Sequence, residues 1–213
     1  MNISVLNDIV AGRTPDPVVF TVHQLHRMLA AGIVAEGQPI ELIDGVLMRK
    51  DRGAAGENPM VHGRRHAVTI ARAQKLLERH VGQRDCHVRT QLPLTLSDIS
   101  EPEPDLAVVA GDARDYLDHH PGADEAIAVI EVADSSLDYD RKTKCATYAA
   151  AGIRAYWIVN LVDDQVEVYS LPVLDERRYA NQAVFKPGDC VALGDLPESP
   201  LSLPVDEMIP PRA

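Results

Sequence analysis

The spacing of apolar and polar residues divides the chain into segments typical of helices and of strands. Apolar residues recur at helical intervals in three segments, residues 20–32, 61–81 and 139–151. Short apolar runs bounded by turn residues predict strands at residues 39–50 (a hairpin), 86–94, 105–110, 126–133, 154–160, 165–171 and 178–185. This order of helices and strands indicates an α/β sandwich with a mixed sheet. We expect loop and edge structure after residue 185, where prolines are frequent.

Individual residues indicate where several of these elements begin and end. Thr21 is a candidate N-cap and Gly32 a candidate C′ residue of the first helix. Asp44-Gly45 predicts a tight hairpin turn, and residues 51–59 read as a glycine-rich loop. The long helix 61–81 is expected to bury the face formed by Val61, Val68, Ala71, Leu76 and Val81.

Two isolated acids in apolar strands are the first candidates for chemistry. The strand 126–133 is apolar except for Glu131, and a carboxylate in a buried strand is costly unless it is paired or bound to a metal. Asp105 opens the apolar strand 105–110. We predict that these two strands are neighbours, so that both carboxylates converge at one edge of the sheet. Such a pair favours a cation between them, and hard oxygen ligands suit Mg²⁺.

A third acid and a lysine are candidates for the same place. Glu41 lies at the start of an apolar strand, and Lys144 lies 13 residues after Glu131, near the start of the next helix. Acids, a metal ion and a lysine together would make a site for phosphodiester hydrolysis. A buried salt bridge between Glu131 and Lys144 is the alternative, and spacing alone does not decide between the two.

The charge of the chain is unevenly distributed. The formal net charge is −11, which by itself disfavours nucleic acid as a partner. Residues 49–89, however, hold ten basic and four acidic side chains, a net charge of +6 against −17 for the rest. We therefore predict a nucleic-acid face on this section that includes Arg72, Lys75 and Arg79, with a solvated helix face as the alternative. Aromatic residues make up only 4%, which argues against a surface that stacks single-stranded bases.

Cysteine usage and the apolar runs indicate the cellular setting. The three cysteines are far apart and form no CxxC motif, so we expect neither a disulfide framework nor a cysteine zinc site. A reducing cytosol, and hence a cytoplasmic location, is the simplest setting. We expect no signal peptide, because the first residues do not form a basic region followed by an apolar core. We expect no membrane span, because no apolar run reaches about 20 residues.

Four segments in the same order carry a resemblance to a known family. They read IELIDG, SEPEPDLAVV, VIEVADSS and YDRKTKCATYAAAGIRAYWIVN. The chain resembles the Uma-two family of the PD-(D/E)XK restriction-endonuclease-like superfamily. The resemblance implies an α/β fold with a restriction-endonuclease-like mixed β-sheet core flanked by helices. It covers a domain at residues 20–205, which leaves an N-terminal extension, 1–19, and a C-terminal tail, 206–213.

The resemblance also assigns roles to residues. It makes Asp105 the motif aspartate and Glu131 the motif glutamate, both as metal ligands. The superfamily pattern has lysine two residues after the glutamate, where this chain has Ala133. Uma-two sequences are similar in this respect, with the lysine displaced onto the next helix. That position is Lys144 here, and Lys142 is an outside candidate.

Glu41 matches an additional acidic position of the family, as a further catalytic residue and metal ligand. His66 matches a histidine common in the family, which would contact phosphate or orient a metal-bound water. A plain polar residue at the start of a helix is the alternative. His62 and His66 form an i,i+4 pair, but without the glutamate of HExxH the pair is a weak zinc signal. We expect the following at the surface: His23, His26, Glu101, His119 and His120.

Two functions from different classes remain. The first is a Mg²⁺-dependent endonuclease that acts on DNA, with Mn²⁺ able to substitute. The second is a non-catalytic nucleic-acid-binding or interaction protein that keeps the nuclease fold. The sequence does not decide between DNA and RNA, and it leaves a homodimer open.

Overall fold

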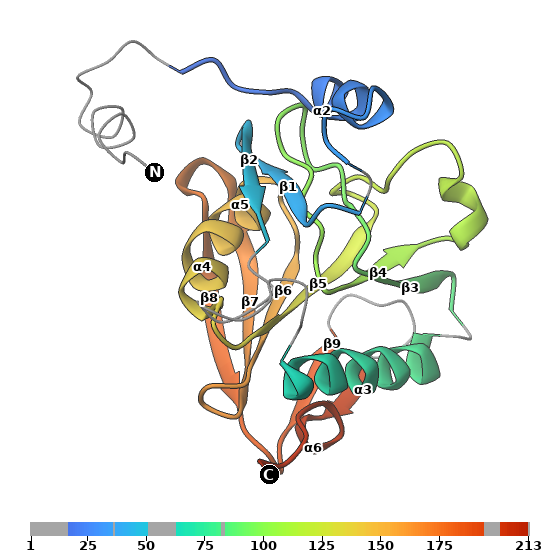
Figure 1. Cartoon of the computed structure of the whole chain (residues 1–213). Coiled ribbons are helices and arrows are strands. Elements are labelled where there is room, and N and C mark those ends of the chain that lie inside the picture. Colours follow the sequence, from blue (N-terminus) through green and yellow to red (C-terminus); the bar gives the residue numbers. More distant parts are fainter. Residues whose placement is uncertain (1–16, 36, 51–62, 82–83, 194–200, 213) are drawn as a thin grey trace.

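The computed structural model describes residues 17–35, 37–50, 63–81, 84–193 and 201–212, and within them a six-stranded sheet forms the centre (Figure 1). In spatial order its strands are β3 (Cys86–Thr90), β4 (Leu106–Ala110), β5 (Ala126–Ala133), β6 (Ala155–Asn160), β7 (Gln165–Val173) and β8 (Arg178–Phe185). Neighbouring strands are antiparallel except β5 and β6, which run parallel. The predicted α/β class with a mixed sheet is confirmed.

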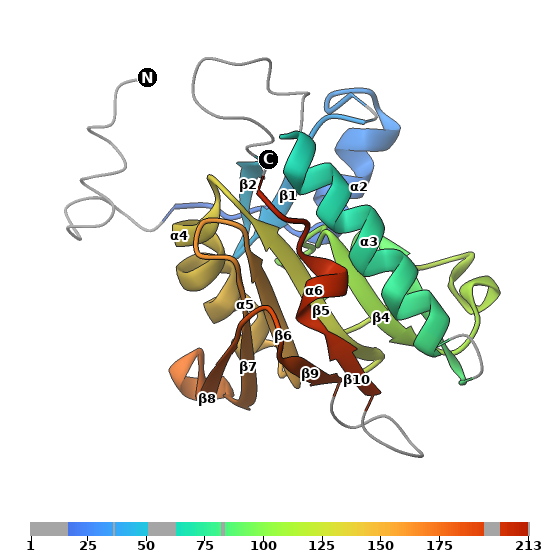
Figure 2. The ribbon, with the colours of Figure 1, turned by 90° about the horizontal axis from the view of Figure 1, so that it is seen from below.

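Helices cover both faces of this sheet (Figure 2). On one face lie α3 (Arg64–Val81), α6 (Val205–Met208) and the paired strands β9 (Cys190–Leu193) and β10 (Leu201–Pro204). On the other face lie α4 (Leu137–Tyr139), the π-helical turn η2 (Asp140–Lys144) and α5 (Cys145–Ala150). Because β5 is covered on both sides, its nearly continuous apolar sequence is what such a strand requires.

A smaller unit lies at one end of the sheet. It consists of α2 (Val22–Ala30) and the hairpin β1 (Ile40–Ile43) and β2 (Val46–Arg49). Two short 3₁₀ turns lie elsewhere, η1 (Ala113–Tyr116) and η3 (Leu174–Glu176). Thr21 caps α2 as predicted, because its hydroxyl accepts from Gln24 N at 3.2 Å. Asp44 and Gly45 both have positive φ, 49° and 77°, as a tight hairpin turn requires.

The predicted buried face of the long helix is wrong at two positions. Val68 is 48% exposed and Ala71 is exposed, whereas the buried stripe consists of Thr69, Ile70, Ala73, Leu76, Leu77 and Val81. The stripe includes a polar residue because the Thr69 hydroxyl donates to the Arg65 carbonyl at 2.8 Å, which satisfies it inside the helix. Val61 and the predicted loop 51–59 lie outside the described residues.

Two strand predictions also need correction. The strand predicted at 86–94 ends at Thr90, the last residue paired regularly with β4, and Gln91 then leaves the extended conformation with a positive φ of 51°. The segment after residue 185 is not only loop and edge, since it forms β9, β10 and α6. Its apolar residues recur at intervals of two, and Val191, Leu203 and Val205 are completely buried. The prediction of loop and edge structure relied on the frequent prolines and did not take this alternation into account.

Within the ranges that the structure describes, no helix combines the length and the apolar character needed to span a bilayer. The ranges predicted for the N-terminal extension, the central domain and the tail stay a prediction, since residues 1–16 lie outside the described part.

Candidate active site

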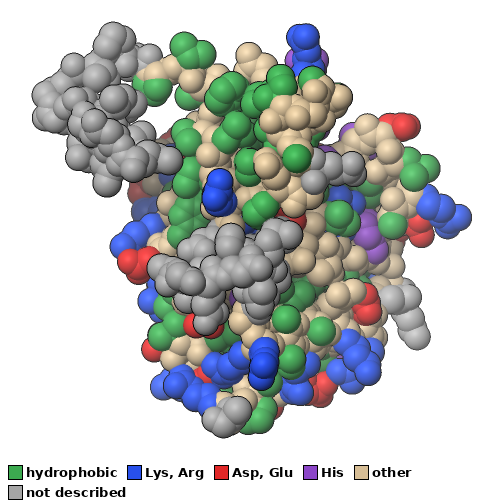
Figure 3. Space-filling view, viewed as in Figure 1, with side chains coloured by type: hydrophobic (Ala, Val, Ile, Leu, Met, Phe, Trp, Pro, Cys, Tyr) green, Lys and Arg blue, Asp and Glu red, His purple; other side chains and the backbone are tan. Residues whose placement is uncertain are grey.

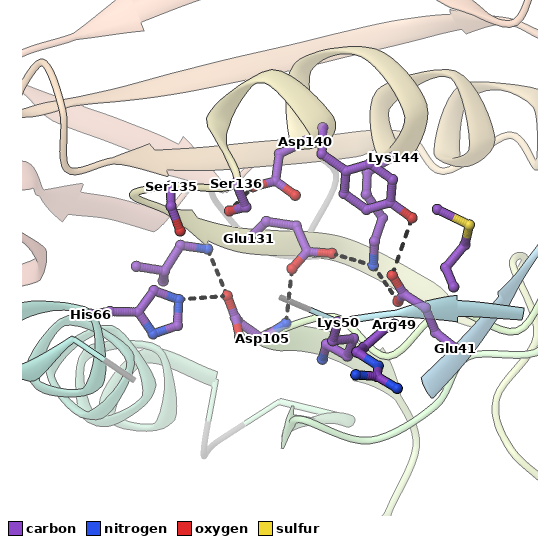
Figure 4. A pocket seen from close by; sticks show the side chains of 13 residues that line it. Glu41, Arg49, Lys50, His66, Asp105, Glu131, Ser135, Ser136, Asp140 and Lys144 are labelled. Atoms are coloured by element: carbon purple, nitrogen blue, oxygen red, sulfur yellow. Dashed lines mark hydrogen bonds and ion pairs between the residues drawn. The ribbon is translucent and has the colours of Figure 1, made fainter. Parts of the chain in front are cut away.

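A pocket of about 300 Å³ opens where the β1–β2 hairpin, the first turn of α3, the ends of β4 and β5, and the segment 135–144 come together (Figure 4). The predicted site residues that line it are Glu41, His66, Asp105, Glu131 and Lys144. They come from five separate elements, so the fold brings together residues up to 103 positions apart in the chain.

Asp105 and Glu131 lie side by side because β4 and β5 pair with Leu106 opposite Ile130. Each carboxylate is fixed by the backbone of the other strand: the Asp105 amide donates to Glu131 Oε2 at 3.2 Å, and the Val132 amide donates to Asp105 Oδ2 at 2.9 Å. The two side chains are almost fully buried, with exposed fractions of 7% and 5% for the residues. The prediction that these are adjacent strands is confirmed.

The environment gives the two acids different electrostatics. Burial would raise the pKa of Asp105, but His66, whose Nε2 is 3.4 Å away, outweighs it together with Lys50 and the Val132 amide, and that pKa falls to about 2. The same contact raises the pKa of His66 against the effect of its own burial. Burial raises the pKa of Glu131, although the charge of Lys144 opposes the rise. Two carboxylates in this surrounding are more stable as anions when a further cation is near.

Lys144 lies between two acids. Its Nζ is 2.6 Å from Glu41 Oε2 and 3.1 Å from Glu131 Oε1, and all three residues are buried. The Glu103 amide also donates to Glu41 Oε2, at 3.2 Å. Lys142, the outside candidate, has a side chain that is 73% exposed and pairs with Asp138 on the same helical segment. The structure therefore brings Lys144, and not Lys142, into the pocket.

Sequence reasoning missed several residues that line the pocket or lie behind it. Tyr148 OH donates to Glu131 Oε1 at 2.8 Å, and Tyr139 OH donates to Glu41 Oε1 at 3.4 Å. Tyr148 follows Lys144 by four residues, and this helical spacing was the signal that could have found it. Asp140 is buried and accepts from the Ser136 hydroxyl at 2.6 Å. Its burial, followed by the charge of Glu131, raises the pKa of Asp140 to about 8.

Lys50, at the end of the hairpin, was counted only as part of the basic section. Its Nζ donates to the Glu103 carbonyl at 2.5 Å and lies 3.7 Å from Glu103 Oε1. Its positive charge also lowers the pKa of Asp105. Glu103 is thus engaged with Lys50 and, through its amide, with Glu41. Of the segment 101–105, Asp105 is the residue that lines the pocket.

The helix residues predicted to meet nucleic acid lie apart from this pocket. Arg72 donates to the carbonyls of Asp206 and Glu207 in α6, at 2.7 and 3.0 Å. Arg79 pairs with the Glu207 carboxylate at 2.5 Å, whereas Lys75 is exposed. On the face in Figure 3, Lys and Arg side chains gather around α3 and α6 with acidic side chains among them. Two of the three basic residues therefore hold α6, and their predicted role in binding stays a prediction.

The donor set of the pocket fits a hard cation at one end. Asp105 and Glu131 offer adjacent carboxylate oxygens, the ligand type that Mg²⁺ prefers. Glu41 is separated from Glu131 by the Lys144 ammonium. Within the described residues, these acids do not form a set of three with all ligand atoms within 4.8 Å of one another. The pair fits a metal ion better than the trio does.

Three features define an α/β protein of the nuclease-like class: the mixed sheet, the acids at β4 and β5, and the lysine on the following helical segment. The chain belongs to the Uma2 family, whose model, described as "Putative restriction endonuclease", matches residues 22–206. A comparison with curated proteins found no match.

A solved structure shares the fold. It is the crystal structure of "a putative nuclease belonging to DUF820" from Anabaena variabilis, which is 19% identical with a TM-score of 0.62. The match covers 90% of this chain and 97% of that chain. At this identity the similarity shows the fold alone, and it confirms the predicted restriction-endonuclease-like architecture.

Proposed function

We propose that the protein is a metal-dependent endonuclease that hydrolyses phosphodiester bonds in DNA. The observation that carries this proposal is the buried pair Asp105 and Glu131, with the Lys144 ammonium 3.1 Å from Glu131. A binding module has no need of adjacent buried carboxylates. Membership of a family described as "Putative restriction endonuclease" supports the same class of reaction.

The residues divide the work of hydrolysis between them. Asp105 and Glu131 would hold Mg²⁺ or Mn²⁺. Glu41, on the other side of the Lys144 ammonium from Glu131, would be a further ligand at the rim of the site. The bound ion supplies polarisation of a phosphoryl oxygen and a lowered pKa of water. His66 would keep the Asp105 carboxylate oriented through its Nε2, which lies 3.4 Å from Asp105 Oδ2.

Lys144 would donate to a phosphate oxygen and stabilise the charge that develops on it. The oxygen of a water molecule forms a bond to phosphorus, and the bond from phosphorus to the leaving oxygen breaks. The attacking water gives up a proton to solvent, and the leaving oxygen takes one up and becomes a hydroxyl. One end of the cut strand then carries a phosphate monoester and the other a hydroxyl.

Cleavage of plasmid and single-stranded DNA in Mg²⁺, in Mn²⁺ and in EDTA tests the proposal. We expect nicked or linear products with either metal ion and none in EDTA or from Asp105→Asn. Asp138→Asn is the matched control, because its side chain is 83% exposed and pairs only with Lys142 among the contacts described. Undiminished cleavage by Asp105→Asn, or in EDTA, would contradict the proposal.

A non-catalytic nucleic-acid-binding role is the second candidate. It is favoured by the Lys144 ammonium, which already offsets two buried carboxylates. Calorimetric titration with Mg²⁺ separates the two functions. The nuclease should bind the ion and lose that binding in Asp105→Ala, whereas a binding module should show no binding in either chain.

A further inference from the structure

A second cluster of metal-ligating side chains lies away from the pocket, beneath α2. His26, Glu101 and His120 each present one ligand atom, and these three atoms lie within 4.8 Å of one another. His26 Nε2 is 2.7 Å from Glu101 Oε1, and the His26 and His120 rings meet edge to face at 6.1 Å. The prediction that all three are surface residues is wrong for Glu101, which is only 5% exposed.

The cluster has supports that a chance contact between side chains would lack. The Thr95 hydroxyl donates to the second oxygen of Glu101 at 2.7 Å, so the carboxylate is fixed in orientation with Oε1 turned to His26. Such a hydrogen bond behind a ligating carboxylate is the usual arrangement at metal sites. The Thr95 amide also donates to the Pro121 carbonyl at 2.9 Å, which holds the segment carrying His120 beside it.

The ligand types identify the class of metal. Two imidazole nitrogens and one carboxylate oxygen suit Zn²⁺ and related divalent transition ions, and they do not suit Mg²⁺. Around a tetrahedral Zn²⁺ two such ligand atoms lie about 3.3 Å apart, so the His26–Glu101 contact has to widen by about 0.6 Å. His26 is 47% exposed and has the freedom to make this movement.

Solvent can supply the remaining ligand. A hollow of about 490 Å³ adjoins the cluster, and both His26 and Thr95 line it. A site with three protein ligands and one water is a common form of zinc coordination. Burial lowers the pKa of His120, and the positive charge of Arg89 lowers it further. The same charge would oppose a bound cation.

The cluster lies where a bound metal ion would connect α2 to the rest of the molecule. α2 packs on the rest of the molecule through a small apolar cluster of Val22, Leu25 and Leu42. It lies over the segment that joins β3 to β4, where the Val22 amide donates to the Asp98 carbonyl at 2.7 Å (Figure 1). A metal ion shared by His26, Glu101 and His120 would join the helix to two further segments.

We propose that His26, Glu101 and His120 form a second metal site, which takes Zn²⁺ or a similar transition ion and fastens α2 to the body of the protein. Glu101 also pairs through its backbone with Leu42, at 2.8 Å from its amide to the Leu42 carbonyl. Since Leu42 follows Glu41, the site steadies one wall of the pocket while supplying no group to it.

Calorimetric titration with Zn²⁺ tests this site in the full-length chain without a histidine tag. Excess Mg²⁺ keeps the carboxylate pair occupied, and the titration is repeated in Asp105→Asn to remove that pair. We expect about one Zn²⁺ per chain in both. His26→Ala and His120→Ala should weaken the affinity by more than about 100-fold. His23→Ala and His119→Ala are the matched controls and should bind as the unaltered chain does.

A second measurement guards against variants that fail to fold. Thr95→Val removes only the hydrogen bond behind Glu101, and it should weaken Zn²⁺ binding by about 10- to 100-fold. Hydrogen exchange of the α2 amides should slow on addition of Zn²⁺ in the unaltered chain and stay unchanged in His26→Ala. Absence of Zn²⁺ binding in the unaltered chain, or equal binding by His26→Ala and His120→Ala, would overturn the proposal.

Discussion

Replacement of Lys144 by methionine is the sharpest perturbation of the pocket. Methionine keeps an unbranched apolar stem of similar length and removes the ammonium, which contacts Glu41 at 2.6 Å and Glu131 at 3.1 Å. The side chain of Lys144 is only 3% exposed, so water cannot replace the lost contacts. Removal of one partner from a buried ion pair typically costs about 3–5 kcal/mol.

Lys142→Met is the matched control for this change. Lys142 lies two residues earlier, but its side chain is 73% exposed and pairs with Asp138 four residues before it. Such exposed helical pairs contribute about 0.3–0.5 kcal/mol. The two substitutions are chemically identical, so the difference in unfolding free energy between them isolates the effect of burial.

Urea unfolding in EDTA provides the measurement. We expect Lys144→Met to lower the free energy of unfolding by about 3–5 kcal/mol and Lys142→Met by less than about 0.5 kcal/mol. Adding Glu41→Gln to Lys144→Met should recover part of the loss, because one of the two stranded charges is gone. Equal midpoints for the two single variants would refute the view that Lys144 neutralises the acids.

The same variants report on catalysis if the chain cleaves DNA. Lys144→Met should reduce the cleavage rate by on the order of a hundredfold, which is typical for loss of one electrostatic stabiliser. Substrate affinity should change much less, since the charge acts in the transition state. Loss of cleavage in Lys142→Met with activity kept in Lys144→Met would show that the lysine has been misassigned.

Further predictions concern contacts around the pocket and on the surface. Burial would raise the pKa of Glu167, but Arg141 and other donors outweigh it and lower this pKa from 4.5 to about 2. The carboxylate therefore stabilises the fold above pH 4.5, and this contribution is lost as the pH falls toward 2. Glu167→Gln should therefore cost about 1–3 kcal/mol at pH 7 and progressively less in urea unfolding below pH 4.5. Tyr148→Phe should destabilise the fold by about 1–3 kcal/mol in the same assay, since Glu131 loses a buried donor at 2.8 Å. Lys75→Glu should reduce the slope of log binding constant against log salt by at least about one if α3 meets nucleic acid, and an unchanged slope in a filter-binding assay would make α3 a solvated face.

The sequence was sufficient for the parts of the site that local patterns determine. A single acid in each of two apolar runs predicted that β4 and β5 are neighbours, because burial of a lone carboxylate needs a nearby partner. The family resemblance favoured Lys144 over Lys142, and the two side chains point to different sides because two residues along a helix turn a side chain away. Roles for Asp105, Glu131 and Glu41 in metal binding stay predictions.

The remainder depends on contacts between distant segments. His26, Glu101 and His120 lie in three separate parts of the chain, and no local pattern predicts that they meet. The sequence did not predict a place for Lys50 beside the pocket, because its partner, Glu103, is 53 residues away. Such positions are determined by tertiary packing, which propensity and periodicity do not describe.

In the segment from Glu101 to Asp105, every second residue contacts a different part of the molecule. Its three acids reach three different places: Glu101 goes to His26 and Thr95, Glu103 to the hairpin, and Asp105 to β5. Pro102 and Pro104 stand between them and carry no amide hydrogen, so the intervening positions bring no donor that needs a partner. Because alternate residues of an extended chain share a side, deletion of one residue here would turn the remaining acids away from their partners together. The number of residues between Glu101 and Asp105, more than the identity of any one acid, therefore keeps α2, the hairpin and β5 in register with one another.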